Sequence, residues 1–431
     1  MNQDALDWLF SLAQFGIKFG LDNIRTLVAS LDHPERHYRS VHVAGTNGKG
    51  SVTAIVEQAL RSAGHKTGRY TSPHLLDLSE RFAIDGVPVG HDLLVDAVTT
   101  VRAVVERLRA GGVLEVHPTF FEVTTAAAFE IFRRSEVDVA VCEVGLGGRL
   151  DATNVLSPVA CAITSIAFDH EQYLGRTLAA IAGEKAGIIK PRTPVVVGNM
   201  PTEAREEIRK VASRMDAPLV DAMDGAEIGA IELLPDGSQR FELRTPRREY
   251  GAVRLALAGD HQVENAVVAV RLLEQVESAG TAVGPDAIIS ALANVRWAGR
   301  LERIVLADGR EALLDAAHNA AGAAALAHHL ERTREMRPLV FSAMRDKDAA
   351  GMLAALAPSV SRLIVTRASN PRATEPSELA SIAARVAPAL QVEVEESPAT
   401  ALTRAWSTSP RIVVAGSIFL LADAMKQLGR S

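Results

Sequence analysis

The chain has 431 residues, of which 48% are hydrophobic and 23% are charged, and its formal net charge is −6. This length and composition predict two or three domains with full hydrophobic cores. The mildly acidic charge argues against nucleic acid or a membrane surface as a partner. The sequence has no uncharged apolar stretch long enough to span a membrane and no basic N-terminal region typical of a signal peptide. Cys142 and Cys161 lie in apolar runs, which predicts buried reduced thiols and a cytoplasmic protein.

Short apolar runs alternate with amphipathic segments through the first half of the chain. The run 137–144 is apolar at both odd and even positions, which is typical of a strand that helices cover on both faces. Strands that alternate with helices in this way predict an α/β fold with a doubly wound, mostly parallel sheet. The predicted strands are 41–44, 69–71, 137–144, 159–166 and 194–198, with helices at 119–132 and 202–214.

The pattern changes twice in the second half. Residues 217–257 alternate apolar and polar side chains, which predicts a small antiparallel excursion from the first sheet. A helix is predicted at 261–274, and a second α/β pattern begins near residue 295. We therefore expect a larger domain over residues 1–295 and a smaller Rossmann-like domain over residues 296–431. The predicted strands of the smaller domain are 312–315, 339–343, 363–366 and 412–415, with helices at 320–333 and 375–386.

The stretch "VHVAGTNGKGSV" at residues 41–52 resembles a phosphate-binding loop with an altered spacing. The usual signature is G-x-x-x-x-G-K-[ST]. Here Val43 stands where the first glycine is expected, and Gly50 follows Lys49, so Ser51 comes one place late. The backbone N–H groups of this turn and the following helix N-terminus still suit a triphosphate. Lys49 would pair with the β- and γ-phosphates.

Polar clusters follow four different predicted strands. Because ligands of open α/β sheets bind outside the carboxyl ends of the strands, these clusters predict one common site. Each cluster alone would also suit an ordinary turn. The clusters are "GTNGKGS" from Gly45, "TSPHL" with Ser72 and His74, "EVGLGGRLDATN" with Glu143, Arg149 and Asp151, and "FDHEQYLG" with Asp169 and His170.

Several of these residues are candidate ligands of magnesium, which prefers oxygen atoms in an octahedral shell. Glu143 is the best carboxylate and Ser72 a suitable hydroxyl, whereas the shifted place of Ser51 makes it a weaker candidate. His170 would either bind a second magnesium or orient a water molecule or Asp169.

Lys185 lies in the apolar segment "GEKAGIIK", which predicts partial burial. Burial of an isolated ammonium lowers its pKa. A neutral lysine amine can react with carbon dioxide to give a carbamate, which is a carboxylate-like metal ligand. From the residues alone, the favoured interpretation is an ordinary helix lysine whose amine reaches solvent.

Three polar groups in the second half would face the phosphate loop across a cleft. They are Asn265 in "GDHQVENA", Arg300 in "WAGRLE", and Asp315 with His318 in "LLDAAHNAAG". Each is also compatible with helix capping or a surface ion pair.

Eight motifs occur in one order along nearly the whole chain, from about Phe15 to Ala424. Through them the chain closely resembles the folylpolyglutamate synthase/dihydrofolate synthase family of the Mur ligase superfamily. The resemblance implies an ATP-dependent ligase that activates a carboxylate as an acyl phosphate, which the amine of L-glutamate then attacks. The motifs are "AGTNGKGS", "YTSPHL", "EVGLGGRLDATN", "ITSIAFDH", "GEKAGI", "GDHQVENA", "WAGRLE" and "DAAHNAAG".

The resemblance also implies roles for single residues. One magnesium would be bound by Ser72 and Glu143, and a second by His170 and a carbamylated Lys185. His318, Asp315 and Ser417 would bind glutamate and assist its attack. The implied ATP contacts are Thr46, Asn47, Gly48, Lys49, Gly50, Ser51, Asn265, Arg300 and Asp315.

The folate side of the site is implied by two further segments. The stretch "TFFE", Thr119, Phe120, Phe121 and Glu122, resembles a motif of dihydropteroate-binding members, in which an aromatic ring such as Phe121 would stack on the pterin. A second pterin contact is implied for Leu150, Asp151 and Ala152. Residues 11–14 do not reproduce a distinctive pattern, so the choice between dihydropteroate and reduced folates stays open.

The family resemblance implies small-molecule partners only and a monomer. Two alternatives remain beside it. One is another Mur-type ligase acting on a peptidoglycan precursor, although such chains carry an extra N-terminal substrate domain and here the phosphate loop begins at Gly45. The other is a nucleotide-gated switch that ligates nothing.

Overall fold

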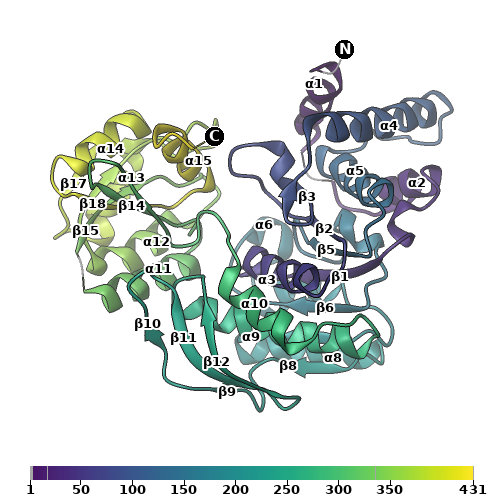
Figure 1. Cartoon of the computed structure of the whole chain (residues 1–431). Coiled ribbons are helices and arrows are strands. Elements are labelled where there is room, and N and C mark those ends of the chain that lie inside the picture. Colours follow the sequence, from purple (N-terminus) through teal and green to yellow (C-terminus); the bar gives the residue numbers. More distant parts are fainter. Residues whose placement is uncertain (1–2, 17, 335, 431) are drawn as a thin grey trace.

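The computed structural model describes residues 3–16, 18–334 and 336–430 of the chain. It contains three sheets, of eight, four and six strands. Figure 1 shows the eight-stranded sheet and the six-stranded sheet side by side, with the small antiparallel sheet below them. Within the described ranges, no helix is both long enough and apolar enough to cross a membrane.

The eight-stranded sheet is mostly parallel and has the order β4-β3-β2-β5-β1-β6-β7-β8. The order of the strands reverses at β1, because β2 and β5 lie on one side of it and β6 and β7 on the other. Such a reversal is where doubly wound sheets bind their ligands. The strands are β1 (Arg39–Ala44), β2 (Thr67–Tyr70), β3 (Phe82–Ile84), β4 (Val87–Pro88), β5 (Val139–Glu143), β6 (Ala160–Ile163), β7 (Val195–Val197) and β8 (Leu219–Asp221).

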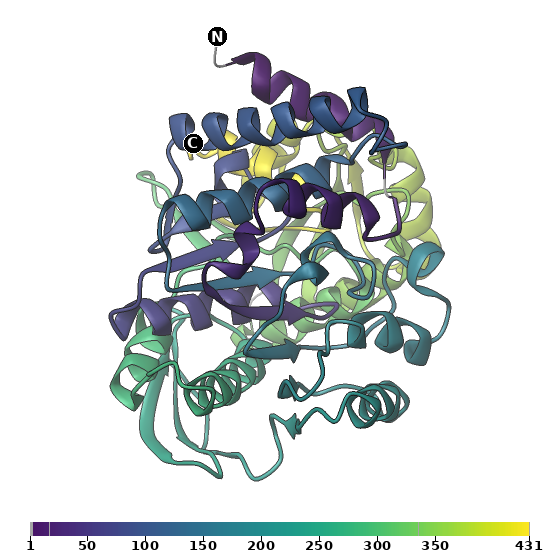
Figure 2. The ribbon, with the colours of Figure 1, turned by 90° about the vertical axis from the view of Figure 1, so that its right-hand side faces the viewer.

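Both faces of this sheet are buried, as the apolar residues at both odd and even positions of β5 predict. Val139 and Val141 face one core, and Ala140 and Cys142 face another. Helices cover the two faces, as the side view in Figure 2 shows. One core contains α3 (Lys49–Ser62), α9 (Asp260–Ser278) and α10 (Pro285–Asn294). The cores on the opposite face contain α1 (Gln3–Ser11), α2 (Asp22–Ser30), α4 (His91–Ala110), α5 (Phe120–Arg134), α7 (Leu178–Ala186) and α8 (Thr202–Arg214). The short helix α6 (Glu171–Leu174) contributes its last residue, Leu174, to the core that contains α7 and α8.

The antiparallel excursion begins later than predicted. Residues 217–257 were expected to form antiparallel strands only, but β8 at the start of this range pairs in parallel with β7. The strand is short and lies at the edge of the sheet, so it has no two-sided apolar pattern to mark it. The antiparallel strands that follow are β9 (Glu227–Ile228), β10 (Glu232–Leu233), β11 (Gln239–Arg244) and β12 (Glu249–Leu255).

The six-stranded sheet has the order β13-β14-β18-β15-β16-β17 and is parallel except for its first strand, β13. Two of its strands, β13 and β17, lie at its edges and were not predicted. The strands are β13 (Glu302–Val305), β14 (Glu311–Leu314), β15 (Arg337–Phe341), β16 (Val360–Val365), β17 (Val392–Val394) and β18 (Arg411–Ala415). The helices are α11 (Ala320–Thr333), α12 (Ala349–Leu356), α13 (Pro376–Val386), α14 (Pro398–Trp406) and α15 (Ile418–Gln427). The predicted fold class, a doubly wound sheet with a smaller α/β unit, is confirmed.

Candidate active site

A cavity of about 320 Å³ lies between the carboxyl ends of the two large sheets. The phosphate loop, 45–51, forms part of its wall together with three other strand ends of the eight-stranded sheet. The segment after β14 faces them from the C-terminal sheet. Of the residues predicted for the site, the cavity is lined by Thr46, Asn47, Gly48, Lys49, Gly50, Ser51, Ser72, Glu143, His170, Lys185, Asn265, Arg300, Asp315 and His318.

The phosphate loop turns into α3 at Gly48, whose φ is +86°. A side chain at this position would be strained, and its Cβ would lie 2.2 Å from the side-chain oxygen of Asn265. Thr46 and Asn47 are fixed by the segment after β6, because the backbone N–H of Thr46 donates to the carbonyl of Ser165 at 2.8 Å. The N–H of Asn47 donates to the Ser165 hydroxyl at 3.0 Å. The loop is therefore rigidly positioned on the sheet.

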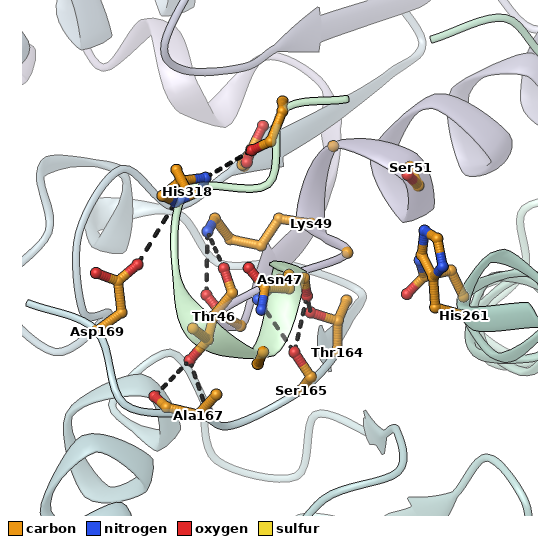
Figure 3. A pocket seen from close by; sticks show the side chains of 18 of the residues that line it. Thr46, Asn47, Lys49, Ser51, Thr164, Ser165, Ala167, Asp169, His261 and His318 are labelled. Carbon is orange, nitrogen blue, oxygen red and sulfur yellow. Dashed lines mark hydrogen bonds and ion pairs between the residues drawn. The ribbon is translucent and has the colours of Figure 1, made fainter. Parts of the chain in front are cut away.

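Lys49 lies at the first turn of α3, inside the cavity. Its Nζ donates to the carbonyls of Gly45 and Thr46, each at 3.1 Å. Figure 3 shows this amine pointing away from α3 toward His318. Burial lowers the pKa of Lys49, and the carboxylates of Glu143 and Asp169 partly offset that effect. A phosphate group would supply the anionic partner that this position favours.

Glu143 ends β5 and is almost fully buried. Burial raises its pKa, while Lys49, Arg300 and a hydrogen bond from the backbone N–H of Ser72 act in the opposite direction. A divalent cation beside this carboxylate would keep it ionised.

Lys185 is buried in α7, with 5% of its surface exposed. Its Nζ donates to the carbonyl of Gly45 at 3.0 Å, so the two lysines of the cavity share one acceptor. Burial lowers the pKa of Lys185 to about 7, and the charge of Lys49 adds to the effect. The burial expected from the sequence is confirmed, and the alternative of an amine in solvent is wrong.

Lys185 is positioned by the loop after β5. The backbone N–H of Arg149 donates to the carbonyl of Glu184 at 2.8 Å. Asn154 donates to the carbonyls of Arg149 and Gly187, each at 3.0 Å. A Cβ at Gly187 would lie 2.3 Å from the Cβ of Arg149, so only glycine permits this approach. The motifs "EVGLGGRLDATN" and "GEKAGI" thus form one interlocked unit.

Asp169 links the two sides of the cavity. Its carboxylate accepts a hydrogen bond from Asn319 at 3.2 Å, forms an ion pair with Lys347, and lies 3.5 Å from Nε2 of His318. Burial acts to raise the pKa of Asp169, but His318, Lys347 and His170 outweigh it and hold the pKa well below its usual range. The carboxylate is therefore ionised at neutral pH.

Asn319 and Lys347 were missed by the sequence reasoning. Asn319 exchanges two hydrogen bonds with Asn47 of the phosphate loop, at 3.0 and 3.2 Å, and also caps α11 through the N–H of Gly322. Lys347 follows β15, so the rule that ligand-binding groups follow strands would have identified it in the second sheet as well. These contacts join the phosphate loop to the C-terminal sheet.

His170 has a φ of +51° at the turn into α6. Burial lowers its pKa to about 4, so the imidazole is neutral at pH 7 and can act as a ligand. Its Nε2 lies 3.3 Å from Nζ of Lys347.

Arg300 lies in the linker between α10 and β13, residues 295–301, and Asp315 directly follows β14 of the C-terminal sheet. The carboxylate of Asp315 accepts hydrogen bonds from the N–H groups of Leu301 and Ala317, both at 2.9 Å. Burial raises the pKa of Asp315, partly offset by Arg300. His261 lines the same cavity, and burial lowers its pKa to about 4.

Several predicted residues lie outside the lining of this cavity. Ser417 is buried and caps α15 by accepting from the N–H of Phe419 at 3.2 Å. Thr119 and Glu122 form a capping box at the start of α5. Phe121 packs against Tyr70, with ring centroids 6.0 Å apart, and Phe120 stacks on Phe10 at the same distance.

The second predicted pterin segment lies in the loop after β5. Asp151 accepts hydrogen bonds from the N–H groups of Leu146 at 2.9 Å and Thr153 at 3.0 Å, so its carboxylate fixes the loop. Leu150 is half-buried and Ala152 is buried.

The donor set fits magnesium better than a soft metal. Among the described residues, no group of three or more His, Cys, Asp or Glu side chains could hold a metal ion by itself. Magnesium commonly takes one or two protein oxygens beside phosphates and water. Ser51 offers a buried hydroxyl without a hydrogen-bond partner, and Ser72 and Glu143 line the same cavity.

Comparison with known proteins supports a Mur ligase. The Mur ligase middle domain matches residues 92–273, and the Mur ligase glutamate ligase domain matches residues 299–418. The fold and site therefore define an ATP-dependent carboxylate–amine ligase of this class.

Relatives narrow the class to one family. The dihydrofolate synthase/folylpolyglutamate synthase of Bacillus subtilis is 34% identical over 430 residues, covering 99% of each chain. The protein of the same name from Mycobacterium tuberculosis is 39% identical over 376 residues, covering 84% of this chain and 76% of the relative. The chain belongs to the dihydrofolate synthase/folylpolyglutamate synthase family.

Solved structures agree with this assignment. The M. tuberculosis folylpolyglutamate synthase complexed with ADP and AMPPCP superposes with a TM-score of 0.92 at 35% identity, over all of both chains. E. coli FolC in complex with DHPP and ADP gives a TM-score of 0.86 at 26% identity, over 99% of this chain and 97% of that one.

Proposed function

We propose that this enzyme adds L-glutamate to a reduced folate, and also to dihydropteroate, through an acyl phosphate. The observation that carries the proposal is the single cavity in which the phosphate loop, Glu143 and Lys185 face Asp315 and His318. The phosphate loop, Glu143 and Lys185 suit a nucleotide with its metal ions, and Asp315 and His318 suit an amino acid. We place the division between an ATP-binding domain, 1–295, and a glutamate-binding domain, 296–431, in the linker between α10 and β13.

The nucleotide phosphates are proposed to lie on the loop 45–51 with Lys49 paired to the γ-phosphate. Attack of a carboxylate on that phosphate brings two anions together, and Lys49 and Arg300 supply positive charge that lowers the repulsion. Asn265, Arg300 and Asp315 are assigned to the rest of the nucleotide.

Magnesium would offset phosphate charge and polarise the transferred group. We assign Ser72 and Glu143, with Ser51 as a further hydroxyl, to one ion. His170 and a carbamate on Lys185 are assigned to a second. The amine of Lys185 donates to the carbonyl of Gly45 at 3.0 Å, and a carbamate would keep one N–H for this acceptor.

The acyl phosphate must be kept from water until the amine of glutamate attacks it. The contacts of Asn47 with Asn319 and of Asp169 with Lys347 close the C-terminal sheet over the phosphate loop. His318 and Asp315 are proposed to hold glutamate there together with Ser417, whose neighbour Gly416 donates its backbone N–H to the carbonyl of Ala317 at 2.9 Å. Thr119, Phe120, Phe121, Glu122, Leu150, Asp151 and Ala152 are proposed to form the pterin side.

We further infer a cytoplasmic monomer without a nucleic-acid or membrane partner, in line with the net charge of −6 and the two buried, unpaired cysteines.

The deciding experiment supplies ATP, magnesium and radiolabelled L-glutamate, first with dihydropteroate and then with tetrahydrofolate. We expect ADP release that depends on glutamate, and labelled products with both acceptors. Product from only one acceptor would restrict the substrate range. ADP release without any labelled product would indicate a nucleotide switch, and product only from a peptidoglycan precursor would indicate another Mur-type ligase.

A further inference from the structure

A second cavity, of about 660 Å³, lies on the other side of the linker. Its walls are the turn 233–237, the segment 256–258 and the linker 295–303. Across from them, Glu311, Arg337 and Arg411 stand at the beginnings of β14, β15 and β18. The cavity is therefore at the amino ends of the C-terminal strands, opposite to the edge that holds the nucleotide cavity. We call it the linker cavity.

The lining of the linker cavity is strongly cationic. It contains six arginines and three acidic residues, although the chain as a whole has a net charge of −6. A local excess of one charge in a concave site attracts ligands of the opposite charge. The arginines are Arg296, Arg300, Arg303, Arg337, Arg411 and Arg430, and the acids are Asp236, Glu302 and Glu311.

The acidic residues already have partners. Glu311 accepts from Arg303 at 2.6 Å and from Arg337 at 2.7 Å. Glu302 accepts from the backbone N–H of Gly299 at 2.9 Å and lies 3.9 Å from Arg430. Asp236 pairs with Arg254, which lies outside the lining. The anionic groups of the wall are thus committed to other cations.

Arg296 remains for a ligand, and Arg300 is shared with the catalytic cavity, where its charge also acts on Glu143 and Asp315. Within the described part of the chain, neither Arg296 nor Arg300 forms a hydrogen bond or an ion pair. Both lie in the linker, four positions apart. A guanidinium binds phosphate or carboxylate oxygens through two parallel N–H groups, so this pair suits a ligand with more than one oxyanion group.

His329 gives the same wall a neutral donor. Its side chain is buried, and burial lowers its pKa to about 4, with the charges of Arg337 and Arg332 adding to the effect. The apolar part of the wall includes Trp297 and Leu313.

We propose that the linker cavity binds a small multivalent oxyanion, held by Arg296 and Arg300, as an effector site separate from the catalytic cavity. Arg300 is the only described residue that lines both cavities. A ligand that draws Arg300 into the linker cavity changes the affinity of the nucleotide, and the nucleotide changes the affinity of the effector by the same factor.

The test uses the full chain with magnesium at rising AMPPCP concentrations up to saturation, where the catalytic phosphate positions are filled, so that the change in anion affinity measures the coupling through Arg300. Calorimetry measures the binding of pyrophosphate in one arm and of citrate in the other, which separates phosphate from carboxylate ligands. We expect one site for at least one of the two anions. In Arg296→Gln we expect the affinity to fall at least tenfold. Arg240→Gln is the matched control, since Arg240 is an exposed arginine on β11 outside both cavities.

Arg296→Lys keeps the charge and loses the planar fork, so its affinity should fall between those of the wild type and Arg296→Gln. Ligation without added anion should be unchanged in both variants, which shows that they fold. The proposal is overturned if neither anion binds the AMPPCP complex, or if Arg296→Gln and Arg240→Gln bind as tightly as the wild type.

Discussion

Lys185 gives the sharpest test of the proposed chemistry, because a carbamate forms only on a neutral amine. Burial lowers the pKa of this lysine from 10.5 to about 7. This change corresponds to a preference of ~5 kcal/mol for the neutral form over that of a solvated lysine. At pH 7.5 a large share of the Lys185 amines is then neutral, against about one in a thousand for an ordinary lysine.

The reaction itself joins the amine nitrogen to the carbon of carbon dioxide and releases one proton. At constant dissolved carbon dioxide, the ratio of carbamate to unmodified Lys185 should therefore rise about tenfold per pH unit above pH 7 and more steeply below it, where the ammonium must lose a second proton. Metal-free protein in ¹³C-labelled bicarbonate would show a carbamate signal by NMR with this pH profile. Lys185→Ala should lack the signal, whereas Lys210→Ala, which removes an exposed lysine on α8, should keep it.

The ligase activity should depend on the same carbamate of Lys185. Lys185→Ala removes a charged ligand position, so we expect kcat to fall by ~10²- to 10³-fold. Added acetate should restore part of the loss by supplying a carboxylate. Lys185→Arg should stay inactive, because guanidinium remains charged and forms no carbamate. A signal that titrates near pH 10, or full activity in Lys185→Arg, would refute the reasoning.

Three further variants test other parts of the site. Lys49→Ala should lower kcat/KM by ~10³-fold or more, while its melting temperature changes by less than ~4 °C; near-normal turnover would remove Lys49 from the mechanism. Glu143→Gln keeps the shape of the side chain and should raise the magnesium concentration for half activity by ~10-fold or more, so an unchanged magnesium titration would make Glu143 structural. Asn319→Asp keeps the cap of α11 but places a second carboxylate beside Asp169, so kcat should fall and X-ray scattering should give a larger radius of gyration; the variant would count against the closing role if both stayed at wild-type values.

Much of the architecture could be predicted because the central strands have a two-sided apolar pattern. β5 is buried at all five positions, and its sequence has no polar residue before Glu143. Edge strands lack that signal. β8 is half-buried throughout, and β13 has two charged residues followed by two apolar ones in "ERIV", with no strand-like alternation, so neither stood out from a loop.

The candidate site was found largely through the ends of predicted strands. Lys347 was missed because it lies in "RDKD", which resembles a solvated charged run. Its side chain is only 9% exposed, because it forms a buried ion pair with Asp169, which lies 178 residues away in the chain. The place of Lys347 after β15 marks the segment as a candidate, but its burial depends on how the two sheets meet, which no local pattern encodes. The same reason left Asn319 unnoticed beside His318.

The interlock between the loop after β5 and α7 has a consequence for protein engineering. The backbone of Arg149 touches Gly187, and a Cβ at Gly148 would lie 2.8 Å from the carbonyls of both Glu184 and Lys185. A side chain at either glycine would therefore push the loop after β5 away from α7 and move Lys185. Engineered loops in residues 143–154 should accordingly keep the lysine in place only if they retain a glycine at position 148, although the two stretches lie far apart in the sequence.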